Sequence, residues 1–105
     1  MILYNVTLNV EEGIHEEWQA WMIEKHIPDV MATGMFLDYQ MCKLISHQEQ
    51  GVTYAIQYRC KDMKTLHNYQ TNHAPELQKE VIEKYADKCV AFRTLLEVID
   101  HNTHG

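Results

Sequence analysis

The chain is poor in the residues on which several common kinds of site depend. It has only four glycines, so it offers no glycine-rich loop to cradle a phosphate group. Its single serine, Ser46, stands in a polar turn, which argues against a serine nucleophile. Three cysteines occur without a Cys-x-x-Cys pair, so a disulfide framework is not expected. No His-Glu-x-x-His motif is present, and we expect neither a metal nor a cofactor.

Basic residues are also scarce. Nine Lys and Arg stand against fifteen Asp and Glu, for a net charge of −6, and no segment concentrates the basic side chains. This balance argues against nucleic acid or an anionic membrane as partner. No apolar run approaches the ~20 residues that span a bilayer. The N-terminal residues also lack the pattern of a signal peptide. We therefore expect a cytoplasmic protein of bacterial type.

What is present is the composition of a globular domain. The 105 residues are 46% hydrophobic and 10% aromatic, which is enough to build a core. We expect a single ferredoxin-like domain over residues 1–100 and a polar tail over residues 101–105.

Hydrophobic periodicity predicts six elements. Residues 2–10, 52–60 and 89–100 alternate as strands do, and residues 35–46 form a further strand. In the last strand, Val90, Phe92, Leu96 and Val98 share one face. Helical spacing runs over residues 14–26, and a second helix begins after Asp62, its expected N-cap. Pro28 and Pro75 should kink or restart these helices, which then end near residues 33 and 87.

The resulting order is βαββαβ, which predicts an α+β fold. We expect a ferredoxin-like sandwich in which a four-stranded antiparallel sheet carries the helices on one face. A short internal repeat supports two similar halves, because His26-Ile27-Pro28 parallels His73-Ala74-Pro75 at an offset close to that of two of the strands.

Several longer motifs carry a family resemblance. They are Tyr4-Asn5-Val6-Thr7, His15-Glu16-Glu17-Trp18, His26-Ile27-Pro28-Asp29-Val30, Gly51-Val52-Thr53-Tyr54, His73-Ala74-Pro75 and Ala91-Phe92-Arg93-Thr94-Leu95-Leu96-Glu97. Together they resemble a family of short bacterial proteins catalogued as a domain of unknown function. More distantly, the topology resembles the dimeric α+β barrel superfamily, which includes cofactor-free monooxygenases, haem-degrading enzymes, isomerases and ligand-binding modules. This resemblance implies the fold and a homodimer, but no particular chemistry.

In the haem-degrading enzymes of that superfamily, the site is a trio of Asn, Trp and His residues. Asn5 and His73 are the candidates for two of these positions in this chain. The second helix, however, carries Tyr69 and no tryptophan, so the sequence departs from that pattern.

The first candidate site is a cleft between the helices and the sheet. His26 shares a helical face with Trp18, and His73 shares one with Tyr69. Tyr4, Tyr54 and Tyr58 fall on apolar strand faces that we expect to meet those helices. Either histidine could act as a general base in this aromatic pocket. Alternatively, both could be structural and satisfy carbonyls where one helix ends and the next begins.

The second candidate site is the opposite face of the sheet. We expect Asn5, Gln57, Arg59, Arg93 and Glu97 to point there. An arginine on this face could bind a carboxylate ligand. Alternatively, Arg59 or Arg93 could pair with Glu97 across a homodimer interface.

The sequence therefore supports three functions. The first is an uncharacterised homodimer of the dimeric α+β barrel type that binds a small molecule. The second is a cofactor-free monooxygenase-like or isomerase-like enzyme with a histidine base. The third is a protein-interaction module without a ligand.

Overall fold

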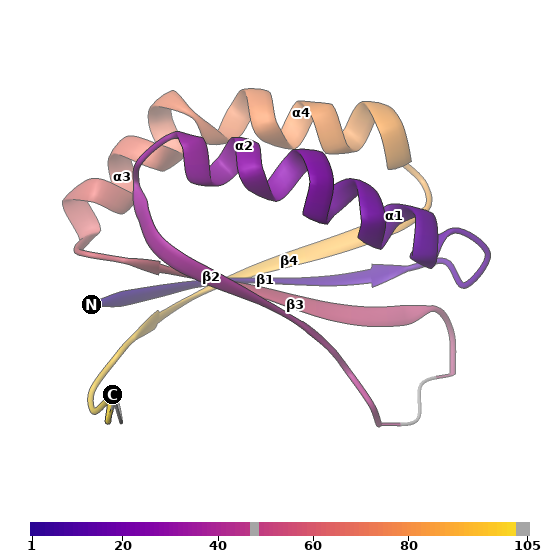
Figure 1. The fold of residues 1–105 in the computed structure, drawn as a ribbon, viewed down its shortest axis with the longest axis horizontal. Helices are drawn as coiled ribbons and strands as arrows, with labels where there is room; N and C mark the ends of the chain where they lie inside the picture. The colour runs from indigo at the N-terminus through magenta and orange to yellow at the C-terminus, as the bar shows by residue number, and fades with distance from the viewer. Residues whose placement is uncertain (47–48, 103–105) are drawn as a thin grey trace.

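Four antiparallel strands form one sheet, and all the helices cover one face of it (Figure 1). The computed structural model describes residues 1–46 and 49–102. The strand order is β2-β3-β1-β4, so the N-terminal strand lies inside the sheet. This confirms the predicted α+β, ferredoxin-like fold. The elements are β1 (Ile2–Val10), α1 (His15–Trp21), the π-helical turn η1 (Met22–His26), α2 (Ile27–Ala32), β2 (Phe36–Lys43), β3 (Val52–Cys60), α3 (Met63–Asn72), α4 (Ala74–Tyr85) and β4 (Cys89–Glu97).

The alternating sequences of β1 and β3 bury one face of the sheet. Directly paired residues such as Val6 and Ile56 point to the same side, so two apolar rows lie next to each other. The helices cover these rows, and Trp18 and Leu66 pack fully buried between the two layers. The buried side chains of the two strands are Tyr4, Val6, Leu8, Val10, Val52, Tyr54, Ile56, Tyr58 and Cys60.

The first helical segment continues through Pro28. From His15 to Ala32 the chain stays helical, but η1 interrupts the α-helical pattern for one turn. At its end, the Ile27 N–H donates to the carbonyl of Met22, five residues earlier. Pro28, in the first turn of α2, has no N–H to continue the ladder. A π-helical turn of this kind places its side chains differently from a regular α-helix and is frequent at functional sites.

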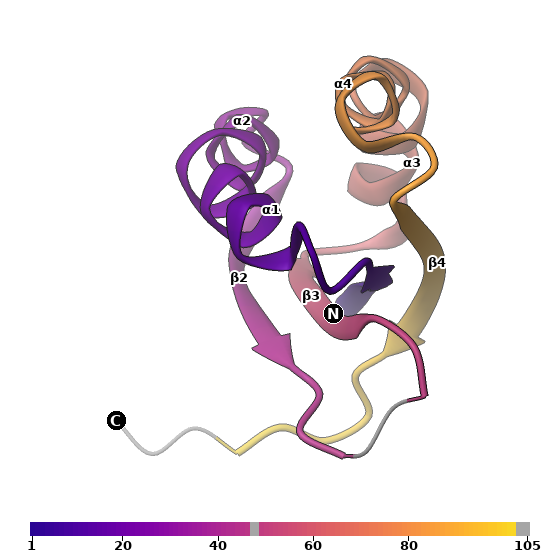
Figure 2. The ribbon, with the colours of Figure 1, turned by 90° about the vertical axis from the view of Figure 1, so that its right-hand side faces the viewer.

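The second helical segment divides into two helices before Pro75. Asp62 caps α3 by accepting a hydrogen bond from the Thr65 N–H at 2.8 Å, as the sequence predicted. The helix ends at Asn72, and Pro75 occupies the first turn of α4, where a missing N–H is tolerated. Seen end-on, α1 and α2 cover the β2 side of the sheet, and α3 and α4 cover the β4 side (Figure 2).

The face predicted for the last strand is wrong. Val90, Phe92 and Leu96 point away from the helices and are 59%, 63% and 43% exposed. The pairing with β1 decides this, because Arg93 lies opposite the inward-facing Val6, and Phe92 lies opposite the outward-facing Thr7. The strand also ends at Glu97, before the predicted residue 100.

Two predicted segments lie partly outside the described residues. These are the polar turn at 46–51, in which residues 47–48 are not described, and the tail, in which residues 103–105 are not described. In the part of the chain that is described, no helix is long and apolar enough to cross a membrane.

Candidate functional site

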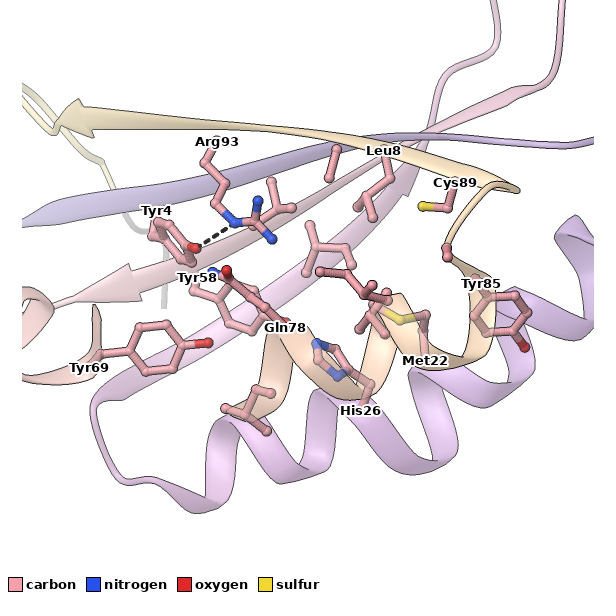
Figure 3. Close-up of a pocket in the computed structure, with 17 residues that line it drawn as sticks. Tyr4, Leu8, Met22, His26, Tyr58, Tyr69, Gln78, Tyr85, Cys89 and Arg93 are labelled. Atoms are coloured by element: carbon pink, nitrogen blue, oxygen red, sulfur yellow. Dashed lines mark hydrogen bonds between the residues drawn. The ribbon is translucent and has the colours of Figure 1, made fainter. Parts of the chain in front are cut away.

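A cavity of about 250 Å³ lies between the helical layer and the sheet (Figure 3). Its walls come from β1, β3, β4, η1, α3 and α4. Aromatic and aliphatic side chains dominate the lining, as in most small-molecule sites. Three side chains bring nitrogen donors or acceptors to it, namely His26, Gln78 and Arg93.

The wall of the cavity next to β4 is lined mainly by small side chains. Ala86, Cys89 and Ala91 line this wall, and the bulky Val90 and Phe92 point to the other face of the sheet. The register of β4 therefore leaves space beneath α4. With the register reversed, valine and phenylalanine would fill the same volume.

His26 brings a neutral imidazole to the cavity. The π-helical turn places it one turn after Met22, and both side chains line the same wall. The ring is 9% exposed and stacks on Trp21, with 5.6 Å between ring centroids. Burial lowers the pKa of His26 to about 4, and nearby Asp29 opposes this shift. Its Nδ1 atom is buried and has no hydrogen-bond partner.

Arg93 brings the positive charge. The sequence placed it on the outer face with Glu97, but the structure contradicts this. Arg93 lines the cavity, and its Nε donates to the Tyr4 hydroxyl at 3.1 Å. Glu97 pairs with Ile2 and so lies on the same side of the sheet, not on the outer face. The reason is the shift of the whole β4 pattern by one residue.

Two tyrosines and a cysteine in the lining stay protonated. Burial raises the pKa of Tyr58 and of Tyr69, and neighbouring tyrosines add to the effect. Burial also raises the pKa of the Cys89 thiol to about 11, and the charge of Arg93 opposes that rise. A thiol with such a pKa is a poor nucleophile near neutrality. Among these groups, the cavity offers hydroxyl donors and no thiolate.

The structure brings together only some of the predicted cleft residues. His26, Tyr58 and Tyr69 line the cavity, but Trp18 and Tyr54 do not. These two rings pack against each other in the core, 4.8 Å apart.

His73 lies outside the lining. It stands between α3 and α4, where its half-buried ring stacks on Tyr69.

The hydroxyl of Tyr54 is hydrogen-bonded to side chains of α1, outside the cavity. It donates to Gln19 Oε1 at 3.1 Å and lies 2.9 Å from Nδ1 of His15. A hydroxyl has one proton, so His15 Nδ1 donates to it.

The outer face carries the remaining predicted residues. Asn5 and Gln57 lie directly opposite each other there, and Arg59 lies two residues further along β3, opposite Leu3. Gln57 accepts a hydrogen bond from Gln40 at 2.6 Å. Arg59 binds the Asp38 carboxylate in a bidentate manner, and its Nε donates at 2.7 Å. This hydrogen-bonded pair lowers the pKa of Asp38. Within this chain, the partner of Arg59 is therefore Asp38.

Sequence reasoning missed Gln78, Met22 and the small residues of the β4 wall. A signal was present for the first, because Leu77, Gln78, Val81 and Tyr85 follow helical spacing along α4 and line one wall. Met22 stands four residues before His26, so helical spacing places the two side chains on one face. The small residues gave no signal, since alanine and cysteine are ordinary core residues.

The residues do not fit a haem group. Asn5 faces away from the helices, and His73 lies on the helical side of the sheet, so the two cannot reach one ligand. A volume of about 250 Å³ also lies below the ~300–1,000 Å³ of pockets for drug-sized ligands, and a porphyrin is larger than these. Within the described residues, no three His, Cys, Asp or Glu side chains are grouped to hold a metal ion.

The fold and the cavity define a ferredoxin-like α+β protein with a pocket under its helices. The chain belongs to the family described as Domain of unknown function (DUF4286), which matches residues 1–99. No curated protein matches it.

Solved structures share the fold at low identity. One is a dimeric ferredoxin-like protein from an uncultured marine organism, with a TM-score of 0.73 and 12% identity over 98% of both chains. Another is a mutant of SnoaB from Streptomyces nogalater, described as a cofactor-independent oxygenase, with a TM-score of 0.66 and 7% identity over 95% of both chains. A third is a mutant of MhuD with two manganese protoporphyrin IX per active site. It has a TM-score of 0.74 and 12% identity over 99% of this chain and 100% of that chain.

Proposed function

We propose that this protein is a homodimer that binds a small organic molecule in the helix–sheet cavity. The observation that carries the proposal is the cavity itself, in which aromatic and aliphatic walls hold three polar side chains, His26, Gln78 and Arg93. A concave apolar site with a few placed polar groups is the usual form of a small-molecule site. The volume of about 250 Å³ favours a ligand of one or two rings.

The likeness to other structures supports this reading at the level of the fold. SnoaB is described as an oxygenase and MhuD as holding porphyrin in an active site, so the same fold serves small-molecule chemistry in other proteins. Identities of 7% and 12% carry no residue roles to this chain.

The dimer part of the proposal rests on the outer face of β4. Val90, Phe92 and Leu96 form an exposed apolar row there, beside the polar rows of β1 and β3. Exposed apolar patches of this kind mark interaction surfaces. A second copy, packed sheet against sheet, is the occupant that we propose. Two neighbours in fold are described as dimeric ferredoxin-like proteins.

The ligand part is tested by filling the cavity. Ala91→Phe places a ring in the β4 wall, and the matched control Ala20→Phe makes the same change at an exposed position of α1, outside the cavity. Titration calorimetry with 2-naphthoate, a two-ring probe, should show binding to the unmodified protein and to A20F, and at least tenfold weaker binding to A91F. Equal binding by A91F, or no binding to any variant, would overturn this part.

The dimer part is tested by light scattering after size exclusion. The unmodified chain should elute at twice its 12.4 kDa mass, and Phe92→Asp should elute as a monomer. Ile23→Asp is the control, because Ile23 is an exposed apolar residue on the helical layer. A monomeric unmodified chain, or an F92D dimer, would contradict the proposed interface.

A second candidate function is proton abstraction by His26. It is favoured by one observation, the buried imidazole that lines the cavity with an unpartnered Nδ1. The base would take a proton from a carbon next to a carbonyl and leave an enolate. Hydrogen–deuterium exchange at C1 of 2-tetralone, followed by NMR, tests this. Exchange should be faster with the protein and should return to the background rate in His26→Gln. A rate equal to background with the unmodified protein removes this candidate.

A further inference from the structure

The charge inside the cavity differs from that of the whole chain. The chain carries a net charge of −6. Among the described residues that line the cavity, however, Arg93 is the only charged side chain, because His26 is neutral above pH 4 and no Asp or Glu is present. The remaining lining is aromatic, aliphatic or uncharged polar.

The guanidinium of Arg93 is also only partly used. Its Nε donates to Tyr4 Oη, which fixes the side chain against β1 (Figure 3). Within the described part of the chain, its two terminal Nη nitrogens make no hydrogen bond and no ion pair. Arg59, the comparable residue on the outer face, uses both Nε and Nη on Asp38. The sheet thus has one arginine that is satisfied by its own chain and one that is not.

We propose that Arg93 selects the ligand of the cavity, and that this ligand is a small, mostly apolar organic molecule with a single carboxylate. The inference rests on the proposed function, since it names the class of molecule that the same cavity binds. The carboxylate binds the two Nη nitrogens, and the apolar body lies between Tyr58, Tyr69 and Met22.

Three physical arguments support this class of ligand. The terminal nitrogens of an arginine form a planar fork that matches a carboxylate in a bidentate manner. One cation with a neutral imidazole nearby balances one negative charge, not the two of a phosphate monoester. An apolar lining favours a ligand whose remaining surface is apolar, because its polar groups would find few partners.

The electrostatic reach of Arg93 agrees with this placement. Burial raises the pKa of Tyr69 and of Cys89, and Arg93 opposes the rise at both. These two residues lie on different walls, α3 and the start of β4. A carboxylate at the Nη nitrogens would therefore enter a region of positive potential.

The experiment compares a charged and a neutral probe of equal size. Titration calorimetry with 2-naphthoate and with 2-naphthamide is carried out on the unmodified protein, Arg93→Gln and Lys79→Gln. Lys79 is an exposed residue of α4 outside the cavity, 74% exposed in its side chain, so K79Q loses the same charge without touching the site. Circular dichroism confirms that each variant is folded.

We expect the unmodified protein and K79Q to bind 2-naphthoate about tenfold or more tightly than 2-naphthamide, because hydrogen bonds to charged groups contribute more than those between neutral groups. In R93Q the preference should disappear, with naphthamide affinity unchanged. Arg93→Lys keeps the charge but loses the fork, and should keep only part of the preference.

Each other outcome has a separate meaning. If both probes bind equally well to the unmodified protein, or if R93Q keeps the preference, the carboxylate inference fails while cavity binding stands. If K79Q loses the preference as R93Q does, the selectivity comes from overall charge and not from Arg93. If neither probe binds, the proposed function fails, and the inference fails with it.

Discussion

His26 and His73 stand in the same local sequence, two residues before a proline near the start of a helix. Their surroundings nevertheless differ. His26 lies in a π-helical turn within a continuous helical segment, and its buried imidazole lines the cavity. His73 lies at a true break between α3 and α4, where it stacks on Tyr69 outside the lining. The motif places both residues near a helix start, but the packing of each helix on the sheet decides which one reaches the cavity.

The largest expected difference between the two histidines is in acid stability. Unfolded His26 takes up a proton near pH 6.5, but folded His26 takes it up only near pH 4. The free energy of unfolding that His26 contributes by staying neutral is therefore complete above pH 6.5, and it is lost as the pH falls to about 4. The pKa change from 6.5 to about 4 corresponds to roughly 3 kcal/mol. In His26→Gln, the free energy of unfolding should therefore fall by less between pH 7 and pH 4, which urea unfolding at the two pH values measures.

His73→Gln is the matched control for that measurement. It changes the same residue type at the equivalent place in the repeat, but outside the cavity. Because His26 is still present in H73Q, this variant should keep the loss of stability at acid pH that His26 causes. An H26Q profile as steep as the H73Q profile would show that His26 is not held neutral by burial.

A third histidine, His15, differs from His26 because its Nδ1 has a hydrogen-bond partner. It donates to the hydroxyl of the buried Tyr54. Tyr54→Phe removes this bond and the bond to Gln19, and should cost about 1 kcal/mol of unfolding free energy. Tyr39→Phe is the control, since Tyr39 is 42% exposed, and should change stability by less than about 0.5 kcal/mol. Equal losses would mean that the His15 contact adds nothing to stability.

The smallest expected effect concerns the two arginines. Arg59 lowers the pKa of Asp38 through their hydrogen-bonded pair. Arg59→Gln should therefore raise the pKa of Asp38 toward its ordinary value, measured by carboxyl carbon NMR. Arg93→Gln should leave it unchanged, because Arg93 lies on the other side of the sheet. A response of Asp38 to R93Q would contradict the assignment of the two arginines to opposite faces.

The strands that alternate cleanly could be predicted from the sequence. In β1 and β3 every second residue is apolar and the intervening residues are mostly polar, so only one face can be buried. In β4 both faces carry apolar residues, and the larger ones, Val90 and Phe92, were assigned to the core. The structure places small Ala91 there instead, in the wall of the cavity.

The candidate site could be predicted only in part, for the same reason. His26, Tyr58 and Tyr69 were found because they share faces with buried residues. Arg93 was a candidate on the wrong face, since an arginine beside the core contradicts ordinary patterning. No local pattern distinguishes His26 from His73, because the packing of each helix on the sheet decides which histidine reaches the cavity. Homodimer formation and the ligand itself stay predictions.

Amide chemical shifts on addition of 2-naphthoate would locate the ligand on the protein. We expect the shifts to concentrate at cavity residues on three walls, such as Ala91, Val81 and Leu8, and at the side-chain Nε of Arg93. Residues of the outer face, such as Thr53 and Gln57, should respond little. Shifts confined to the outer face, or no shifts at saturating probe, would contradict the cavity as the functional site.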